Sequence, residues 1–429
     1  MVAILPIVND VECLKFLSEE AFNYCQQVIV IDPLPTFYTT CDRYSIRFVS
    51  STSEIIPILP TLKTDFLAYI PFSHNFALPD INSLEGNYLA PLVPAVTLPE
   101  ETAREMLLEA VGWIASLNIA KFALPKLENW TILEIAQVLE LAGVSFRWGG
   151  ARACEDNRQN LPARLNSQSS IMAIVPHYRC EAWLKRCLQC LVEQTRVPDK
   201  IVVVDDGSGN PPVSIVKEFS SVTLLASSVN VGPYRLVEQV ILDTNYDAYL
   251  FQDADDWSTC DRLEKLLQTA ALTGAELLGT QELRVAENAQ ITPVCYPLDV
   301  NAALAEKPGH ALIHPSSLVT RDLVMRLGGF ATGLRFGGDT EFLLRARFAA
   351  KIVNIPEYCY FRRKRMGSLT TATDTGLESP ARLQLLKALK TRALANNTLV
   401  QAGQNPCLSP LIKAKPIRLN YVAGSQWQI

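Results

Sequence analysis

The stretch Tyr249-Leu250-Phe251-Gln252-Asp253-Ala254-Asp255-Asp256-Trp257 decides how the fold of this chain is interpreted. An apolar run ends there in three carboxylates within four positions, as expected of a buried strand that delivers acidic side chains to a sheet edge. Side chains alternate along a strand, so Asp253 and Asp255 would share one face while Asp256 points away or belongs to the turn. Two aligned carboxylates predict a site for a hard divalent cation, Mg2+ or Mn2+. The alternative is a solvated turn that caps a helix beginning at Arg262.

Strands and helices alternate around this stretch at the spacing of βαβ units. Apolar runs over 171–176, 201–204 and 222–226 predict three more buried strands, and amphipathic runs over 181–194 and 234–242 predict helices. The alternation predicts an α/β fold with a Rossmann-like mixed, mainly parallel sheet and helices on both faces.

Polar or conformationally restricted residues stand where these strands end. Pro176 lies at the end of one strand, and Asp205 and Asp206 follow the next. Asp253 and Asp255 follow the apolar run that opens the stretch 249–257, called the acidic stretch below. Ligands of open α/β sheets bind beyond the carboxyl ends of the strands. These residues are therefore expected to converge at one edge of the sheet.

Composition argues against several classes of protein. The formal net charge is -5, and the 39 Lys and Arg residues are dispersed, so nucleic acid is not an expected partner. No apolar run approaches the roughly 20 residues that span a bilayer, and the start does not resemble a signal peptide. Eleven scattered cysteines indicate reduced thiols. We expect a cytoplasmic protein, with peripheral attachment to a membrane left open.

The length of 429 residues predicts more than one domain. Residues 1–150 predict an α/β domain of their own, with a strand over 66–70 and helices over 103–117 and 132–141. The polar segment 151–170 predicts a linker, residues 171–375 the main domain, and residues 376–429 a C-terminal helix, over 380–397, and tail.

The two halves show a weak internal repeat. Ala3-Ile4-Leu5-Pro6 aligns with Ala173-Ile174-Val175-Pro176, and 28–32 aligns with 201–205. Where the acidic stretch should fall, the first half has Pro71-Phe72-Ser73-His74. The first domain is then either a degenerate copy that has lost the metal site or an α/β domain whose apolar strands match by chance.

Several short motifs follow one another in order between about residues 171 and 375. They are Ile174-Val175-Pro176, Val203-Val204-Asp205-Asp206-Gly207-Ser208, Asn230-Val231-Gly232, Gln252-Asp253-Ala254-Asp255-Asp256, Leu327-Gly328-Gly329-Phe330, Gly338-Asp339-Thr340-Glu341-Phe342 and Gly367-Ser368-Leu369-Thr370. In order and spacing this series resembles family 2 glycosyltransferases of the GT-A fold. The resemblance implies transfer of a sugar from a nucleoside-diphosphate donor to an acceptor hydroxyl, with inversion and with Mn2+ or Mg2+.

The resemblance also implies roles for individual residues. Asp253 would address the ribose and the metal, Asp255 the metal, and Asp256 would join that shell as the uncertain member. Asp339 would be the general base that takes the proton of the acceptor hydroxyl, with Glu341 as the near alternative. The residues implied on the nucleotide-sugar side are Pro176, Asp205, Asp206, Asn230, Gly232, Asp253, Arg363, Arg365 and Ser368.

Some positions depart from the family pattern or stay open. Val237 and Glu238 stand where the family often carries a basic residue and an asparagine, which leaves the donor phosphate contacts uncertain. His314 either approaches the sugar or packs in the core. Arg362-Arg363-Lys364-Arg365 either closes over the diphosphate or forms a solvated basic face.

Two other functions compete with glycosyl transfer. A sugar nucleotidyltransferase would carry a glycine-rich stretch after the first strand, and Pro176-His177-Tyr178-Arg179-Cys180 contains no glycine. A non-catalytic nucleotide-sugar-binding or scaffold protein would keep the fold without turnover. The acceptor, whether glycan, lipid-linked or protein, and the donor sugar are not readable from these motifs.

Overall fold

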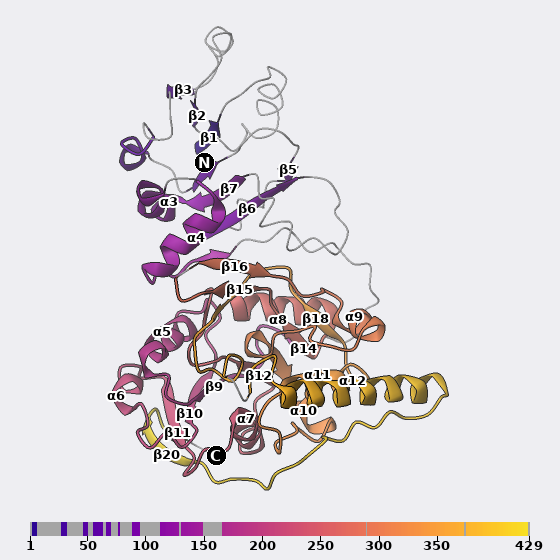
Figure 1. Ribbon diagram of the computed structural model, residues 1–429. Coiled ribbons are helices and arrows are strands. Elements are labelled where there is room, and N and C mark those ends of the chain that lie inside the picture. The colour runs from indigo at the N-terminus through magenta and orange to yellow at the C-terminus, as the bar shows by residue number, and fades with distance from the viewer. Residues whose placement is uncertain are drawn as a thin grey trace. The chain divides into compact units, whose positions relative to one another are not determined.

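The computed structural model describes residues 2–6, 27–31, 46–49, 55–62, 66–69, 76–77, 88–94, 112–127, 130–148, 165–288, 290–372 and 375–427 (Figure 1). The chain divides into two compact units, Met1–Cys154 and Glu155–Ile429. Each unit is described by itself. The division falls inside the predicted linker 151–170, of which the structure describes residues 165–170.

The second unit is built on an eight-stranded sheet with the order β18-β14-β17-β12-β9-β10-β11-β20. Its strands are β9 (Ile171–His177), β10 (Lys200–Asp205), β11 (Val222–Ala226), β12 (Ala248–Phe251), β14 (Leu277–Gly279), β17 (Leu318–Thr320), β18 (Ile352–Asn354) and β20 (Asn420–Gly424). The four strands β11, β10, β9 and β12 run parallel, while β17 and β20 pair antiparallel to their neighbours. The predicted mixed, mainly parallel sheet is confirmed.

The helices of this unit follow the strands as the βαβ pattern requires. They are α5 (Glu181–Val192), α6 (Val213–Val216), α7 (Pro233–Leu242), α8 (Arg262–Thr273), α9 (Val300–Glu306), α10 (Arg321–Arg326), α11 (Gly338–Ala346) and α12 (Pro380–Gln401), with a 3-10 turn at His314–Ser316. A small second sheet has the order β13 (Trp257–Ser258), β19 (Tyr360–Arg363), β15 (Glu282–Val285) and β16 (Ile291–Val294).

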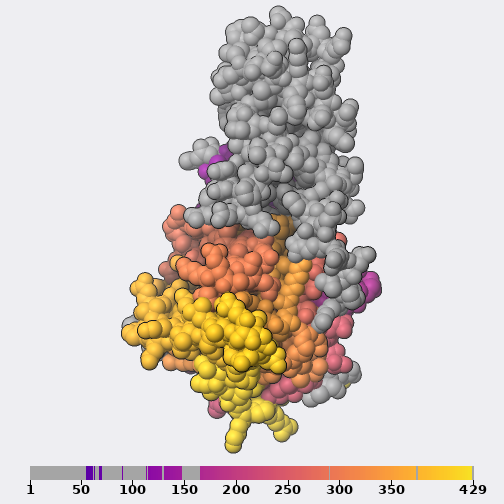
Figure 2. All heavy atoms as spheres, turned by 90° about the vertical axis from the view of Figure 1, so that its right-hand side faces the viewer, coloured from indigo at the N-terminus to yellow at the C-terminus, as the bar shows by residue number. Residues whose placement is uncertain are grey.

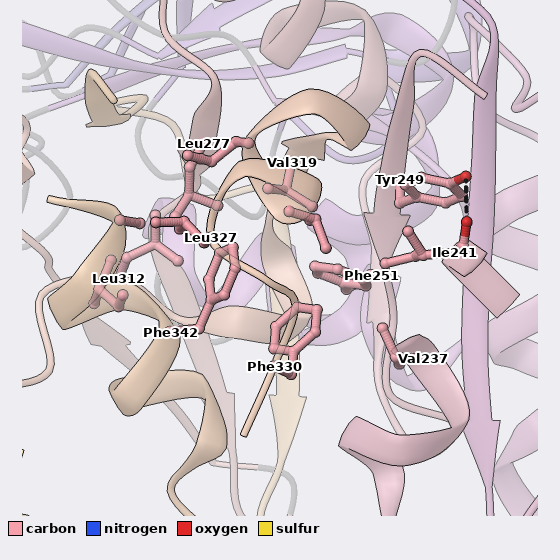
Figure 3. Close-up of a cluster of buried hydrophobic side chains, with 14 of the residues drawn as sticks. Val237, Ile241, Tyr249, Phe251, Leu277, Leu312, Val319, Leu327, Phe330 and Phe342 are labelled. Carbon is pink, nitrogen blue, oxygen red and sulfur yellow. Dashed lines mark hydrogen bonds between the residues drawn. The ribbon is translucent and has the colours of Figure 1, made fainter. Parts of the chain in front are cut away.

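Both faces of the main sheet are buried. Met172, Ile174 and Phe251 belong to one core cluster that also contains buried residues of α7 and α11. Figure 3 shows Phe251 in this cluster together with Val237 of α7 and Phe342 of α11. The alternate residues, such as Ala173 and Val203, are also fully buried. Because successive side chains of a strand point to opposite faces, helices must cover the sheet on both sides.

The C-terminal segment lies over the outside of the second unit (Figure 2). Its helix α12 extends the predicted helix by four residues, to Gln401, and begins with a Ser379 cap and a proline in the first turn. Leu389 is buried against the core cluster, but Leu383 and Leu394 are 55% and 53% exposed. Only one stripe of α12 therefore packs.

The first unit contains a sheet of order β3-β2-β1-β4-β7-β6-β5, with β8 paired to β6. Its described elements are β1 (Val2–Pro6), β2 (Gln27–Ile31), β3 (Ile46–Val49), β4 (Phe66–Tyr69), β5 (Phe76–Ala77), β6 (Tyr88–Pro94), β7 (Gly112–Ser116), α3 (Leu117–Ala123), α4 (Ile132–Leu141) and β8 (Arg147–Trp148), with 3-10 turns at Leu59–Thr61 and Leu124–Lys126.

The predicted helix over 103–117 is wrong for residues 112–116, while residues 103–111 lie outside the described residues. Gly112–Ser116 forms β7, which pairs antiparallel with β4 on one side and β6 on the other. Pairing on both edges outweighed the helical spacing of the apolar residues, as tertiary context commonly does. The predicted helix over 132–141 is confirmed as α4. The stretch Pro71 to His74 lies outside the described residues.

Two composition-based expectations can be compared with the described residues. Seven cysteines in this part of the chain are free thiols, including Cys187 and Cys190 in the buried face of α5. Of the helices that the structure describes, none has the length and apolar character needed to cross a bilayer.

Candidate active site

The acidic stretch leaves the sheet as a turn directly after β12. The strand ends at Phe251, and the Asp256 N–H donates to the Asp253 carbonyl at 3.2 Å. One carboxylate oxygen from each of Asp253, Asp255 and Asp256 lies within 4.8 Å of the others. The strand alternation that separated Asp256 from its two neighbours therefore does not apply, because the residues are no longer extended.

Asp256 is the structural member of this cluster. It is 2% exposed, and both of its oxygens accept hydrogen bonds, from the Tyr360 hydroxyl at 2.9 Å and from the Arg363 N–H at 2.8 Å. The Tyr360 hydroxyl also accepts a bond from the Asp253 N–H at 3.2 Å. Asp256 thus fixes the acidic turn to β19 and has little capacity left for an ion.

Two arginines of the predicted basic segment lie on the acidic turn. Arg365 Nε is 2.5 Å from Asp255 Oδ2, and its Nη2 is 3.1 Å from Cys180 Sγ. Arg363 stacks over Trp257 with its guanidinium carbon 4.8 Å from the ring centre. The basic segment is therefore not a solvated face at these two positions.

The acidic turn carries more negative charge than its surroundings neutralise. Burial and the neighbouring charge of Asp255 raise the pKa of Asp253 to about 7. Burial and the same neighbour raise the pKa of Asp256 above its ordinary value. Within the described part of the chain, no donor is bonded to the Asp253 carboxylate. Oxygen donors with unrelieved mutual repulsion suit a hard divalent cation, so Asp253 and Asp255 fit that group.

The end of β10 and the loop after it supply two further carboxylates at the same sheet edge, since Asp205 is the last residue of β10 and Asp206 follows it. Asp205 is buried and accepts from His177 Nδ1 at 3.0 Å and from the Ser208 N–H at 3.0 Å. Burial opposes its charge, but these donors outweigh burial and lower the pKa of Asp205. The His177 ring is itself held by the Cys180 N–H, which donates to Nε2 at 3.2 Å.

Asp206 holds the loop that follows β11. Its two oxygens accept from the Val231 N–H at 2.7 Å and the Gly232 N–H at 2.9 Å. The Asn230 side-chain amide donates to the Asp206 carbonyl at 3.2 Å. Asp206, Asn230 and Gly232 therefore lie together, and the contacts among them shape the loop. Their predicted role in binding the nucleotide sugar stays a prediction.

Two other predicted donor-side residues differ in position. Pro176 lies in β9, paired with Val204 at the carboxyl end of the sheet. Ser368 lies in a turn after β19, where its hydroxyl is 3.1 Å from Thr370 Oγ1 and 3.0 Å from Thr371 Oγ1. The contacts of Ser368 thus stay within its own turn, and those of Pro176 belong to the sheet.

Asp339 lies in the first turn of α11, where the helix dipole favours a negative charge. The Tyr234 hydroxyl donates to its Oδ1 at 3.0 Å. Burial opposes ionisation, but His310, His314, the Thr340 N–H and the Tyr234 hydroxyl outweigh it, and the pKa of Asp339 is lowered. A carboxylate that stays ionised at neutral pH is available to accept a proton.

Glu341 does not share this availability. Its carboxylate accepts from Arg345 Nε at 2.9 Å and Nη2 at 2.7 Å, from Arg392 Nη1 at 3.1 Å and from the Leu411 N–H at 2.9 Å. The residue is 1% exposed. Glu341 therefore joins α11 to the C-terminal segment and is not placed to act as a base.

His314 packs against aromatic side chains of the core. Its ring lies 4.3 Å from the Phe251 ring and 5.8 Å from the Phe330 ring, measured between centres. Burial lowers its pKa to about 4, so the imidazole is neutral at neutral pH. Of the two interpretations of His314, packing is the one that these contacts support.

Sequence reasoning missed three side chains of this site: His177, Tyr234 and Tyr360. Their partners Asp205, Asp339 and Asp256 are 28, 105 and 104 positions away in sequence. Only His177 had a usable signal, because it follows Pro176 at the end of a predicted strand.

The sequence of the second unit contains a match to a known family. Residues 172–285 match the profile of the family described as "Glycosyl transferase family 2". This chain contains a family 2 glycosyltransferase domain. The predicted resemblance is thereby confirmed for the part of the chain that contains β9 to β12 and the acidic turn.

Curated glycosyltransferases are similar to parts of this chain. An "Uncharacterized glycosyltransferase" of Haemophilus influenzae is 27% identical over 214 residues, which cover 47% of this chain and 72% of that protein. "Glycosyltransferase GlyA" of Streptococcus pneumoniae is 34% identical over 99 residues, which cover 22% of this chain and 14% of that protein.

Solved structures of S. aureus TarS are also similar. The structure of TarS 1-349 in complex with UDP-GlcNAc has a TM-score of 0.44 and 19% identity, with 55% of this chain and 73% of that chain covered. The complex with UDP has a TM-score of 0.43 and 18% identity, with 53% and 66% covered.

Proposed function

We propose that this glycosyltransferase moves a sugar from a nucleoside-diphosphate sugar to an acceptor hydroxyl with inversion, and that it depends on a divalent cation. The donor would lie along the carboxyl edge of β9, β10 and β12. Asp205, Asp253 and Asp255 line that edge, and Arg365 is the basic residue nearest to the acidic turn.

Asp253 and Asp255 would hold the cation. Neither carboxylate is braced by the backbone bonds that occupy Asp256, and the charge repulsion between them is relieved when a cation binds. A bound Mn2+ or Mg2+ would neutralise the negative charge that develops on the departing nucleoside diphosphate.

Asp339 would act as the general base. His310, the Thr340 N–H and the Tyr234 hydroxyl lower the pKa of its carboxyl group, so the ionised carboxylate can accept the proton of the acceptor hydroxyl as that oxygen bonds to the sugar carbon. Attack from the side opposite the departing diphosphate inverts the anomeric centre.

One observation carries this proposal. Carboxylate oxygens of Asp253, Asp255 and Asp256 lie within 4.8 Å of one another at the end of β12, and the charge of Asp339 adds to the effects that raise the pKa of Asp253. The base comes from α11 and the acids from the end of β12, 86 positions apart by their numbers. A base and a metal site in one electrostatic environment fit group transfer between a donor and an acceptor.

The test compares three isosteric variants of the full chain, Asp255→Asn, Asp339→Asn and Asp322→Asn. Asp322 is an exposed carboxylate of α10 that pairs with Arg326 and serves as the matched control. Release of nucleoside diphosphate from UDP-, GDP- and dTDP-sugars is measured with Mn2+ and with EDTA. We expect Asp255→Asn and Asp339→Asn to lose at least about 100-fold in rate and the control to keep it. Equal rates for all three would refute the catalytic assignment.

A sugar nucleotidyltransferase remains the competing enzyme class. It would release or incorporate pyrophosphate and form a nucleotide sugar instead of consuming one. The same samples, incubated with nucleoside triphosphates and sugar phosphates, distinguish the two reactions.

A further inference from the structure

Tyr234 connects the donor side of the site to Asp339. It lies in the first turn of α7, and its hydroxyl donates to Asp339 Oδ1 at 3.0 Å. Its ring packs 6.5 Å from Phe330 and 6.3 Å from His314, measured between centres. Tyr234 is thus held on the ring side by the core and on the hydroxyl side by the carboxylate.

The first residue of α11 is a glycine that makes room for this ring. A Cβ at Gly338 would lie 2.7 Å from Tyr234 Cδ2 and 2.9 Å from Cε2, closer than real Cβ contacts come. The Tyr234 ring therefore lies directly against the backbone that carries Asp339.

The start of α7 is fixed from the nucleotide side. Asp206 holds the Val231 and Gly232 N–H groups, and Gly232 adopts φ 87°, which favours glycine. Pro233 opens the helix, and Tyr234 follows directly. Val231, which Asp206 binds, is separated from Tyr234 by only two residues. A displacement of the loop that contains Asn230, Val231 and Gly232 would therefore move the Tyr234 hydroxyl, which contacts Asp339.

We propose that Tyr234 is a positioning residue that holds Asp339 in the orientation in which it receives the acceptor proton. The inference rests on the proposed role of Asp339. The hydroxyl takes up one lone pair of Oδ1, and the lone pairs that remain on the carboxylate are directed to the acceptor. Loss of this bond frees the carboxylate to rotate.

The pH dependence follows from the groups that face Asp339. These are Tyr234 of α7, the two histidines His310 and His314, and Asp253 at the end of β12, while Arg382 of α12 acts on Tyr234. The tyrosine hydroxyl donates to the charged form of the carboxylate and so favours it. Its removal raises the pKa of Asp339, and the acidic limb of the rate profile moves to higher pH.

The test uses Tyr234→Phe in the full chain, with Tyr249→Phe as the matched control. Tyr249 is also a buried tyrosine of this unit, but its hydroxyl is 3.0 Å from Thr244 Oγ1 in the core. We expect Tyr234→Phe to lower kcat about tenfold, the equivalent of one hydrogen bond, with the donor KM within about twofold and the acidic limb shifted upward. The control should change only the melting temperature.

Two results would overturn the inference, and they are distinguishable. If Asp339→Asn is inactive while Tyr234→Phe has the rate and pH profile of the control, the base stands and the positioning role falls. If Asp339→Asn is active, the proposed function fails and the role of Tyr234 fails with it. If Tyr234→Phe shifts the acidic limb of the rate profile to higher pH and Tyr249→Phe does not, the result supports the positioning role of Tyr234.

The first unit carries a second and independent inference. Its strands β3, β2, β1 and β4 run parallel, β4 pairs antiparallel with β7, β7 with β6, and β6 parallel with β8. The strands β11, β10, β9, β12, β17, β14 and β18 repeat this order and these senses. Strands in corresponding places also follow one another in the same order along the chain.

The pairing registers agree as well. Ala3 pairs with Val28, as Ala173 pairs with Ile201. Ile4 pairs with Tyr69 in β4, as Ile174 pairs with Phe251 in β12. Chance matching of apolar strands does not require the same partners at the aligned positions.

We infer that the first unit is a copy of this sheet without its cation site. Since Tyr69 corresponds to Phe251, counting along the sequence sets Pro71 against Asp253 and Ser73 against Asp255. Neither proline nor serine offers a carboxylate. One cation site per chain is therefore expected, and it belongs to the second unit.

Mn2+ titration of the full chain by electron paramagnetic resonance tests this inference. We expect one Mn2+ per chain, lost in the double variant Asp253→Asn/Asp255→Asn. A second site of similar affinity, or a site that persists in the double variant, would overturn the inference.

Discussion

Arg365 Nε lies 2.5 Å from Asp255 Oδ2, with the side chains only 22% and 16% exposed. The guanidinium therefore occupies a carboxylate that the proposed function assigns to a divalent cation. A cation and an arginine compete for the same oxygen, and an arginine released from it is suited to bind diphosphate oxygens.

Arg365→Ala should change cation and donor binding in opposite directions. Without the competing guanidinium, Asp255 is free and Mn2+ binds more tightly in the absence of donor. The donor loses a charge-assisted contact worth roughly 1.5–3 kcal/mol, which is about 10- to 150-fold in affinity. Calorimetric titration with Mn2+ and then with donor measures both. The control is Lys364→Ala, because Lys364 is an exposed basic residue next to Arg365 in the sequence. If the affinities for Mn2+ and for the donor change in the same direction in Arg365→Ala, this interpretation is contradicted.

Gly207 and Gly209 give a matched pair for stability. Both adopt positive φ, 64° and 82°, but a Cβ at Gly207 would lie 2.4 Å from the Val229 carbonyl carbon, while nothing lies within 4 Å at Gly209. Both alanine substitutions add backbone strain of about 1 kcal/mol or more. Only Gly207→Ala also separates the two loops, so its free energy of unfolding should fall further. If urea unfolding gives the two variants equal decreases in free energy of unfolding, the contact between the two loops does not contribute to the effect of Gly207→Ala.

Glu341→Gln should act on stability and not on the chemical step. The substitution leaves Arg345 and Arg392 without their buried carboxylate, and breaking a buried pair costs roughly 3–5 kcal/mol. The melting temperature should fall steeply, while the rate of folded enzyme, measured below the transition, stays near that of the unmodified protein. A rate loss comparable to that of Asp339→Asn would return Glu341 to the list of candidate bases.

Protonation of Asp205 should lower the stability of the protein at acid pH. The donors His177 and Ser208 lower its pKa in the folded protein below the ordinary value of 3.8. Its contribution is therefore fully present above that ordinary pKa and is lost as pH falls through the lower folded value. Between about pH 5 and pH 3, unfolding free energies of the unmodified protein should decline more than those of Asp205→Asn. Parallel declines would mean that this carboxylate is not stabilised by folding.

The sheet edge could be predicted because its signals are local. Apolar runs ending at Pro176, Asp205 and Asp253 mark the carboxyl ends of neighbouring parallel strands, and the structure brings these ends together. A run of four to eight apolar residues needs no distant partner to be recognised as a strand.

The side-chain partners could not be predicted, because they come from distant parts of the chain. In the sequence, Glu341 is a second acidic residue near the start of a helix and so a candidate base. Its bonds to Arg392 and Leu411, which are 51 and 70 positions away, show that its carboxylate is already occupied. The role of Asp256 cannot be predicted locally either, because its partner Tyr360 comes from another sheet. In β7, pairing to strands on both sides decided the conformation against the helical spacing.

The most direct test of the central claim is thermal unfolding of the full chain with UDP-, GDP- and dTDP-sugars, each with and without Mn2+. A ligand that binds only the folded protein raises its melting temperature. We predict that at least one donor class does so in the presence of Mn2+, that EDTA removes the effect, and that Asp253→Asn/Asp255→Asn abolishes it. No stabilisation by any donor, or stabilisation that survives both EDTA and the double variant, would contradict a metal-dependent nucleotide-sugar site at the end of β12.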